Sequence, residues 1–221
     1  MRPAHVTSKR PEGIRAAIVA DLRANGVADR AFEDVVAEVN VHDFVPLAFR
    51  DQVSADRSLP LECGQFMPAP ALTARIVQSL EAEPNHSVLE IGTGSGYATA
   101  LISRVARKVT TLERYRTLVH AASRRLAVNG MSNAAFLQRD GSVPHRDGIV
   151  YDRILIDSAF EQVPRHYIDM LAANGVLVCA VGPLDGEQQM LRLTKIGSRF
   201  DRQTLFPVRF GGLEKGVATA L

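Results

Sequence analysis

The chain has 221 residues, a length that suits one domain of ordinary size. Its 26 basic and 24 acidic residues nearly balance, whereas a nucleic-acid binder usually shows a basic excess. Apolar runs are short, which argues against a transmembrane helix of about 20 apolar residues, and the basic start, residues 1–11, has no apolar stretch behind it. We therefore expect a cytoplasmic protein that binds neither nucleic acid nor membrane.

The first part of the chain predicts helices followed by an irregular segment. Residues 12–39 have helical periodicity, interrupted at Asn25-Gly26, and Asp29 is a candidate N-cap for the second helix. Residues 46–70 are rich in proline, which is typical of a lid or binding loop. A further helix is expected over 72–80.

From residue 87 onwards, strands alternate with helices. Strands are expected at 87–91, 108–112, 135–138, 153–156 and 175–181, helices at 98–106, 118–129 and 163–171, and a closing antiparallel pair at 190–193 and 204–210. This alternation predicts a mainly parallel, doubly wound sheet covered on both faces. We expect a single domain over 1–221, with a helical, substrate-covering part (12–80), a ligand-binding core (87–182) and C-terminal strands (183–221).

A glycine-rich turn after the strand at 87–91 is the strongest motif. Gly92-Thr93-Gly94-Ser95-Gly96 precedes a helix, and glycines let a ligand approach the backbone. The spacing G-x-G-x-G differs from the dinucleotide fingerprint G-x-G-x-x-G. Glu90, two residues before the first glycine, would repel a pyrophosphate and suits a positively charged ligand such as S-adenosylmethionine.

Two more acids follow the next two strands. Glu113 stands where a carboxylate can accept both ribose hydroxyls, and Asp140, followed by Gly141, stands where an acid can accept from an adenine amino group. Either acid alone could instead pair with a neighbouring arginine. The ordered set of three acids at three strand ends nevertheless predicts an S-adenosylmethionine site. Its candidate residues are Glu90, Gly92, Thr93, Gly94, Ser95, Gly96, Glu113, Asp140 and Gly141.

This loop resembles that of class I S-adenosylmethionine-dependent methyltransferases, which have a Rossmann-like fold. In detail the chain is similar to the protein-L-isoaspartate O-methyltransferases, from about residue 30 to residue 213. The segments that carry this likeness include Phe44-Val45-Pro46, Gly64-Gln65, Asn174-Gly175-Val176-Leu177-Val178 and Phe206-Pro207-Val208-Arg209-Phe210. The resemblance implies repair of isoaspartyl proteins or peptides. Methylation of the free carboxylate gives an ester that collapses to a succinimide, which can reopen to aspartate.

The chain departs from the family pattern beside the expected active site. The family usually has Gly-Gln-Thr-Ile-Ser-x-Pro, with the serine at the active site, whereas this chain has Gly64-Gln65-Phe66-Met67-Pro68-Ala69-Pro70. Proline offers neither a hydroxyl nor an N–H. The resemblance implies that Gln65, the loop around Pro68, and residues 208–210 line the peptide site, and that activity is weaker than in relatives with the serine.

No catalytic triad or metal site is predicted, since Cys63, Cys179 and six histidines are scattered. A carboxylate nucleophile, with a pKa of about 4, needs no general base. Asp157, after the fourth strand, could act as a base for an amine substrate, bind the substrate, or cap the helix near Val163. Besides the repair enzyme, two alternatives stay open: a methyltransferase for another peptide or small molecule, and a non-catalytic module that holds a protein partner.

Overall fold

The computed structural model describes residues 10–145 and 148–219 of the chain. Residues 1–9, most of the basic start, lie outside the described residues. Its helices are α1 (Pro11–Ala24), α2 (Arg30–Glu38), α3 (Pro70–Gln78), α4 (Tyr97–Val105), α5 (Arg116–Val128) and α6 (Arg165–Asp169). Its strands are β1 (Leu59–Pro60), β2 (Phe66–Met67), β3 (Ser87–Ile91), β4 (Lys108–Glu113), β5 (Ala134–Gln138), β6 (Tyr151–Phe160), β7 (Leu171–Val181), β8 (Gln188–Ile196) and β9 (Arg199–Val208).

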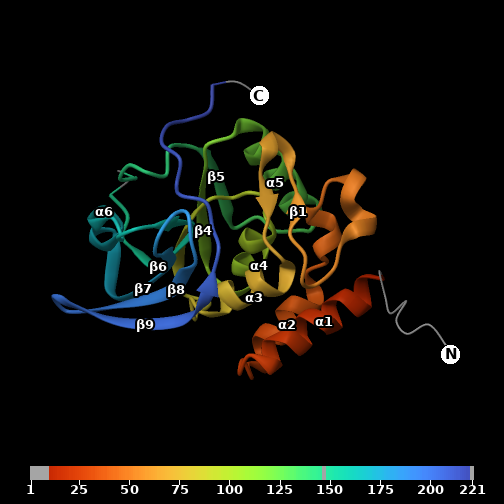
Figure 1. The fold of residues 1–221 in the computed structure, drawn as a ribbon, viewed down its shortest axis with the longest axis horizontal. Helices are drawn as coiled ribbons and strands as arrows, with labels where there is room; N and C mark the ends of the chain where they lie inside the picture. The colour runs from red at the N-terminus through yellow and green to blue at the C-terminus, as the bar shows by residue number, and fades with distance from the viewer. Residues whose placement is uncertain (1–9, 146–147, 220–221) are drawn as a thin grey trace.

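The central sheet has seven strands in the order β5-β4-β3-β6-β7-β8-β9 (Figure 1). The strands from β5 to β7 run parallel, and Ile91 at the end of β3 pairs with Leu112 of β4 and Ile156 of β6. β8 is antiparallel to β7, and β9 is antiparallel to β8. The predicted mainly parallel sheet with an antiparallel C-terminal pair is therefore confirmed.

Apolar side chains cover both faces of this sheet. On one face, Val88 and Val109 belong to a core that includes Leu101 of α4. On the other face, Leu89 belongs to a core that includes Tyr167 of α6. The crossover from β5 to β6 contains no helix among its described residues, so the second face is covered less completely over β4 and β5.

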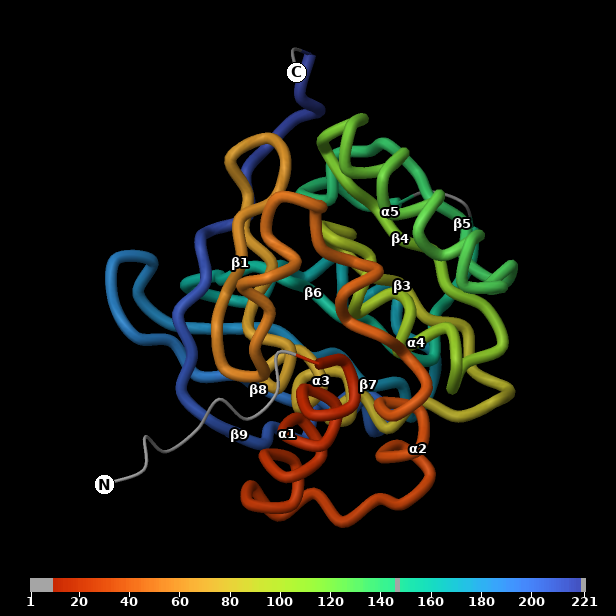
Figure 2. The backbone as a smooth tube through the Cα atoms, turned by 90° about the vertical axis from the view of Figure 1, so that its right-hand side faces the viewer, coloured from red at the N-terminus to blue at the C-terminus, as the bar shows by residue number. Residues whose placement is uncertain are grey.

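The first two helices support the helical layer. α1 packs against α2 and α3, and α2 packs against α4; α1 and α2 lie in the lower part of the view in Figure 2. Asp29 accepts a hydrogen bond from the N–H of Phe32 at 3.1 Å, which confirms the predicted N-cap. Of the segment expected to cover the substrate, 12–80, only the part from Ser58 to Leu72 lines the cleft described below.

Residues 46–70 contain 3-10 turns and a short hairpin. β1 and β2 pair antiparallel, and the connecting turn includes Cys63 and Gly64, whose φ angles of 62° and 66° are left-handed. The hairpin lies beside the C-terminal segment that follows β9, as the orange and blue tubes in Figures 1 and 2 show.

Several elements of the second half differ from their predicted extents. β6, β7 and β8 are longer than expected, β9 begins and ends earlier, and α6 is shorter. The pairing of β6 with β7 shifts register between Ile156 and Ala159, so β6 continues to Phe160 instead of ending at residue 156. The helix expected over 163–171 shrinks to α6, which has Pro164 at its N-cap. Of the three alternatives for Asp157, the role as cap of this helix is therefore wrong, because Asp157 lies within β6 and Pro164 is the N-cap.

Within the described ranges, no helix combines the length and the apolar composition that a membrane span requires.

Candidate active site

The glycine turn connects β3 to α4 and packs closely against the neighbouring elements. The N–H of Gly92 donates to the carbonyl oxygen of Leu112 at 2.8 Å, which fixes the turn to β4. Gly96 has a φ of 84°, and a Cβ there would lie 2.9 Å from Cβ of Ala122 in α5. Glycine is required at position 96 both for its backbone conformation and for this close approach.

Glu90 lies beneath the turn and is buried, although a glutamate side chain is usually exposed. Its side chain is fully buried, and one carboxyl oxygen, Oε2, accepts from the Thr99 hydroxyl at 2.6 Å. The other oxygen, Oε1, has no hydrogen-bond partner in the described part of the chain. Burial raises the pKa of Glu90 to about 8, so the group is mostly protonated at neutral pH.

Two hydroxyl side chains of the turn make internal hydrogen bonds. Thr93 Oγ1 lies 2.5 Å from Thr111 Oγ1 of β4, and Ser95 Oγ accepts from the N–H of Tyr97 at 3.1 Å. These bonds hold the turn against the sheet and satisfy an otherwise unpaired N–H at the start of α4. Ser95 therefore accepts a hydrogen bond from the first turn of α4.

Glu113 ends β4 with its carboxylate turned toward the glycine turn. Its Oε2 accepts from the N–H of Gly94 and its Oε1 from the N–H of Tyr115, both at 3.0 Å. A carboxylate has about four lone-pair sites, so acceptor capacity remains for a further donor.

Asp140 is held by the backbone on two sides. Its Oδ1 accepts from the N–H of Ser142, and its Oδ2 from the N–H of Gly216, each at 2.8 Å. Partial burial opposes ionisation, but these hydrogen bonds outweigh it and lower the pKa of Asp140. Gly141 packs so closely on Ile91 that a Cβ would lie 2.4 Å from Ile91 Cγ2.

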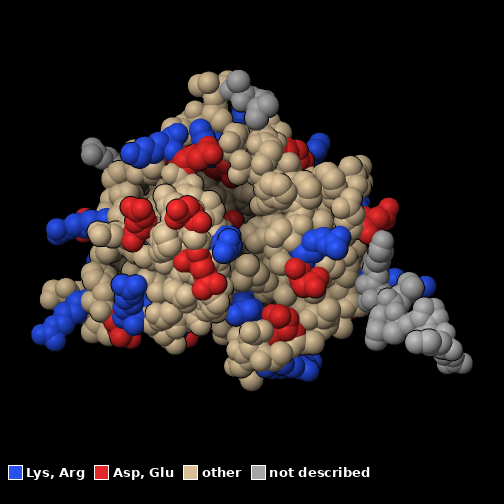
Figure 3. All heavy atoms as spheres, in the orientation of Figure 1, with Lys and Arg blue, Asp and Glu red and all other residues tan. Residues whose placement is uncertain are grey.

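A cavity of about 450 Å³ opens at the carboxyl edge of the sheet, between the hairpin and the C-terminal segment. Figure 3 shows a hollow in this face, with acidic and basic side chains around it. The cavity brings together seven of the predicted site residues: Gln65, Pro68, Gly92, Gly94, Glu113, Gly141 and Asp157.

The remaining predicted residues lie around this cavity. Thr93 and Ser95 line an adjoining space of about 30 Å³, which they share with Pro68 and Asp157. Asp140 lines a separate cavity of about 350 Å³, which shares Leu112 and Arg139 with the main one. Glu90 and Gly96 line none of these spaces and support the turn from below.

Asp157 of β6 lines the cleft beside the glycine turn. Its Cβ would lie 3.2 Å from a Cβ built on Gly92, and its side chain lines both the main and the adjoining cavity. Burial, together with the nearby Glu113 charge, raises the pKa of Asp157 to about 7. At neutral pH this carboxyl group is therefore divided between its charged and neutral forms.

The hairpin forms the opposite wall. Gln65 Nε2 donates to the Tyr115 hydroxyl at 3.4 Å, which links the hairpin to the end of β4. Phe66 is 67% exposed, and Pro68 follows it along the same wall. Arg209 and Phe210 line the cavity from the C-terminal side, as expected, whereas Val208 is buried.

Several residues that line the cavity were not among the predicted site residues. Tyr115 lies two residues after Glu113. Because ligands bind beyond the carboxyl ends of parallel strands, this position in the sequence could have predicted that Tyr115 lines the cavity. Ser58 and Glu214 also line the cavity, but neither belongs to a recognisable motif. Only the pairing of the hairpin strands and the path of the C-terminal segment bring them there.

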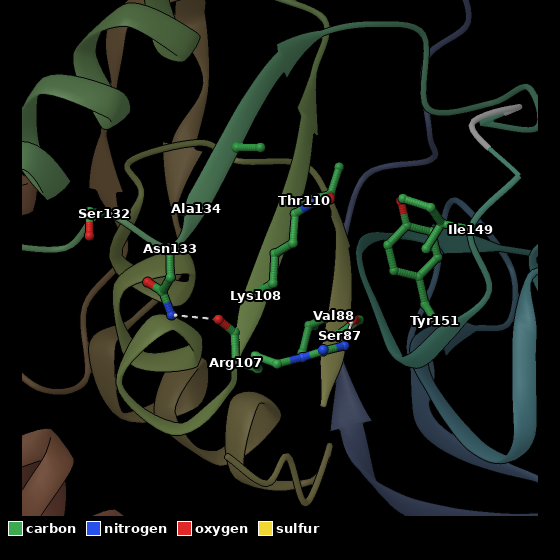
Figure 4. Close-up of a pocket in the computed structure, with 11 residues that line it drawn as sticks. Ser87, Val88, Arg107, Lys108, Thr110, Ser132, Asn133, Ala134, Ile149 and Tyr151 are labelled. Atoms are coloured by element: carbon green, nitrogen blue, oxygen red, sulfur yellow. Dashed lines mark hydrogen bonds between the residues drawn. The ribbon is translucent and has the colours of Figure 1, made fainter. Parts of the chain in front are cut away.

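A larger hollow, of about 610 Å³, lies at the amino edge of the sheet (Figure 4). Arg107 and Lys108 line it at the start of β4, and the Arg107 guanidinium donates to Ser87 Oγ at 3.0 Å. It lies where the helix-free crossover leaves the sheet face incompletely covered. None of the predicted site residues lines it, so size does not mark the candidate site in this fold.

Comparison with protein families gives a match over most of the chain. The family model described as Protein-L-isoaspartate(D-aspartate) O-methyltransferase matches residues 14–218. A protein-L-isoaspartate O-methyltransferase of Azorhizobium caulinodans is 39% identical over 207 residues, which cover 94% of this chain and 95% of the relative. One from a Bradyrhizobium species is 37% identical over 200 residues, with 90% and 93% covered.

Solved structures show the same fold. A Plasmodium falciparum protein-L-isoaspartate O-methyltransferase structure, in complex with S-adenosyl-L-homocysteine, has a TM-score of 0.76 at 19% identity and covers 93% of this chain and 100% of its own. A second protein-L-isoaspartate O-methyltransferase has a TM-score of 0.75 at 23% identity, with 92% of this chain and 67% of that chain covered.

Proposed function

This chain belongs to the protein-L-isoaspartate O-methyltransferase family, and we propose that it methylates the free carboxylate of isoaspartyl residues in damaged proteins or peptides, with S-adenosylmethionine as methyl donor. The observation that carries this proposal is the cavity at the carboxyl edge. It joins the glycine turn and Glu113 on one side to Gln65 and Pro68 on the other, so one space serves a cofactor and a substrate.

The residues of the sheet wall fit the cofactor. A Cβ placed on Gly94 would have no neighbour closer than 3.7 Å, so the backbone there is open to a ligand, and Glu113 retains acceptor capacity for ribose hydroxyls. Asp140 is the candidate acceptor for the adenine amino group, and Gly141 beside it lines the main cavity while it packs against Ile91. S-adenosylmethionine, when bound, supplies a methyl group on a positively charged sulfur.

The protein's main task is then to orient the substrate. A carboxylate with a pKa of about 4 is already a nucleophile at neutral pH, so alignment replaces base catalysis. Gln65 can donate its amide N–H to the peptide, and Arg209 brings a positive charge to the wall that a carboxylate would face.

Asp157 suits a carboxylate substrate because of its raised pKa. A fully charged aspartate would repel the incoming carboxylate, and burial beside Glu113 makes the neutral form accessible near pH 7. We assign Asp157 a place beside the substrate rather than the role of an essential base.

The direct test is an assay with labelled S-adenosylmethionine, an isoaspartyl peptide and its aspartyl counterpart. We expect base-labile methyl ester on the isoaspartyl peptide alone. Calorimetry on the same preparation should detect the cofactor and its demethylated product. Cofactor binding without ester formation at saturating peptide would overturn the repair function and favour a methyltransferase for another substrate.

We further propose that the protein acts in the cytoplasm on isoaspartyl proteins. Cys63 and Cys179 are free thiols in the structure, which suits a reducing compartment. The nearly balanced charge of the chain gives no support for nucleic-acid binding.

A further inference from the structure

The wall that carries Pro68 has a second position facing the same cavity. In the hairpin, Leu59 pairs with Met67 and Pro60 pairs with Phe66. Leu59 and Met67 are buried, at 1% and 2% exposure, so they occupy the core side of the hairpin. Because side chains alternate along a strand, the next pair outwards belongs to the other side, together with Pro60 and the exposed Phe66.

Extending this register by one residue sets Ser58 opposite Pro68. Residues directly opposite each other on antiparallel strands have Cα atoms about 4.5–5.5 Å apart and side chains on one face. Both Ser58 and Pro68 line the 450 Å³ cavity, with Gly92 and Asp157 across from them. A hydroxyl group is therefore present beside position 68, although it comes from the neighbouring strand.

Ser58 is a suitable donor for an incoming carboxylate. It is exposed, and its hydroxyl makes no hydrogen bond to the residues that the structure describes. The other serine of the cavity, Ser158, already donates to the carbonyl oxygen of Asp157 at 2.7 Å. A neutral hydroxyl also suits a site that contains Glu113 and Asp157, because it adds a donor without fixing another charge.

The backbone around Ser58 restrains it. Pro60 and Pro68 each fix a φ angle near −65° on the cavity side of the hairpin. The N–H of Leu61 donates to the carbonyl oxygen of Gln65 at 2.8 Å, which closes the turn. The backbone of the wall is thus stiff for so short a hairpin, so binding costs little backbone entropy at this wall.

We propose that Ser58 donates its hydroxyl hydrogen to one oxygen of the substrate carboxylate, and so supplies from β1 the hydroxyl that Pro68 lacks. The proton stays on Ser58, and the second carboxylate oxygen is left to form a bond to the methyl carbon. The bond from that carbon to the sulfonium sulfur would break at the same time, with its electron pair left on sulfur as S-adenosyl-L-homocysteine departs. This assignment rests on the proposed isoaspartyl function, since it concerns the same site.

The test compares variants of the full chain with an isoaspartyl peptide and labelled S-adenosylmethionine. Ser58→Ala is expected to lower kcat/KM about 10- to 100-fold, as for the loss of a hydrogen bond to a charged group. Ser58→Thr keeps the hydroxyl and should stay within about fivefold of the wild type. Ser54→Ala is the matched control, because Ser54 lies in the same segment but donates to Asp56 at 2.9 Å and does not line the cavity.

Calorimetry separates this role from a structural one. Cofactor affinity and melting temperature should be unchanged in Ser58→Ala, while binding of the isoaspartyl peptide to the protein saturated with S-adenosyl-L-homocysteine should weaken. An active wild type with Ser58→Ala within twofold of it would overturn the role of Ser58 alone. A wild type that binds the cofactor but makes no ester would overturn the proposed function itself.

Discussion

The two walls of the cavity are built on different principles. The sheet wall consists of turns whose atoms are fixed by the core: a Cβ at Gly96 would meet α5, and Glu113 takes hydrogen bonds from two backbone N–H groups. The hairpin wall is exposed at Phe66 and joined to the end of β4 through the long hydrogen bond from Gln65. The fold constrains the first wall and leaves the second free to change, and the departure from the family pattern at Phe66 and Pro68 lies on this second wall.

The largest effect is expected where this constraint is greatest. Gly96→Ala combines a left-handed φ with a contact of 2.9 Å to Ala122, and should lower the free energy of unfolding by about 2–4 kcal/mol. Gly130→Ala is the matched control, because Gly130 has a φ of 70° but open space around it, and should lose about 1 kcal/mol. Equal losses in urea unfolding would show that packing against α5 does not constrain the turn.

The next effect concerns the cofactor. Glu113→Ala should weaken binding of S-adenosylmethionine by about 1–3 kcal/mol, because hydrogen bonds to a charged group are lost. Glu161→Ala, an exposed change outside the cavity, is the control. If calorimetry gives the same cofactor affinity for both variants, Glu113 does not bind the cofactor.

Burial of Glu90 predicts a pH dependence of stability. Its pKa rises from an ordinary 4.5 in the unfolded chain to about 8 in the folded protein. The stability present below about pH 4.5 is therefore lost as the pH rises towards 8, by at most about 1.4 kcal/mol per pH unit. Asp157 adds to this slope between about pH 4 and 7.

Glu90→Gln should flatten that profile, because the amide keeps an acceptor for Thr99 and has no proton to lose. Melting temperatures of the cofactor-free protein between pH 5 and 8 provide the measurement. An unchanged slope in the variant would mean that Glu90 is charged in the folded state.

The two walls also differ in how far the sequence predicts them. A buried strand followed by three glycines leaves few structural options, so the turn, the place of Glu113 at a strand end and the mainly parallel sheet follow from local pattern. Ser58 reaches Pro68 only through β1 and β2, which have two residues each. Pro60 lies within β1 and Pro68 follows β2, and such prolines predict irregular structure. Similarly, one of the two N–H groups that donate to Asp140 belongs to Gly216, 76 residues away in the sequence. No periodic pattern in the sequence predicts such a contact.

A variant of Asp157 tests whether the substrate is a carboxylate or an amine. Asp157→Asn keeps the shape of the cleft and removes a negative charge, so methylation of an isoaspartyl peptide should stay within about fivefold of the wild type. An essential base would instead be worth about 10²–10⁴ in rate. A loss of that size, with cofactor binding retained, would assign proton transfer to Asp157.

The smallest effect is expected from the change that restores the family residue. Pro68→Ser adds a hydroxyl to a wall on which Ser58 already offers one, and it frees a φ angle that proline holds near −65°. We expect kcat/KM for the isoaspartyl peptide to change by less than about threefold, because a second donor gains little while a stiff wall loses order. A rise of tenfold or more, measured beside Ser58→Ala, would show that the hydroxyl at position 58 does not serve the substrate and that the hairpin wall lacks a donor wherever proline stands in place of serine.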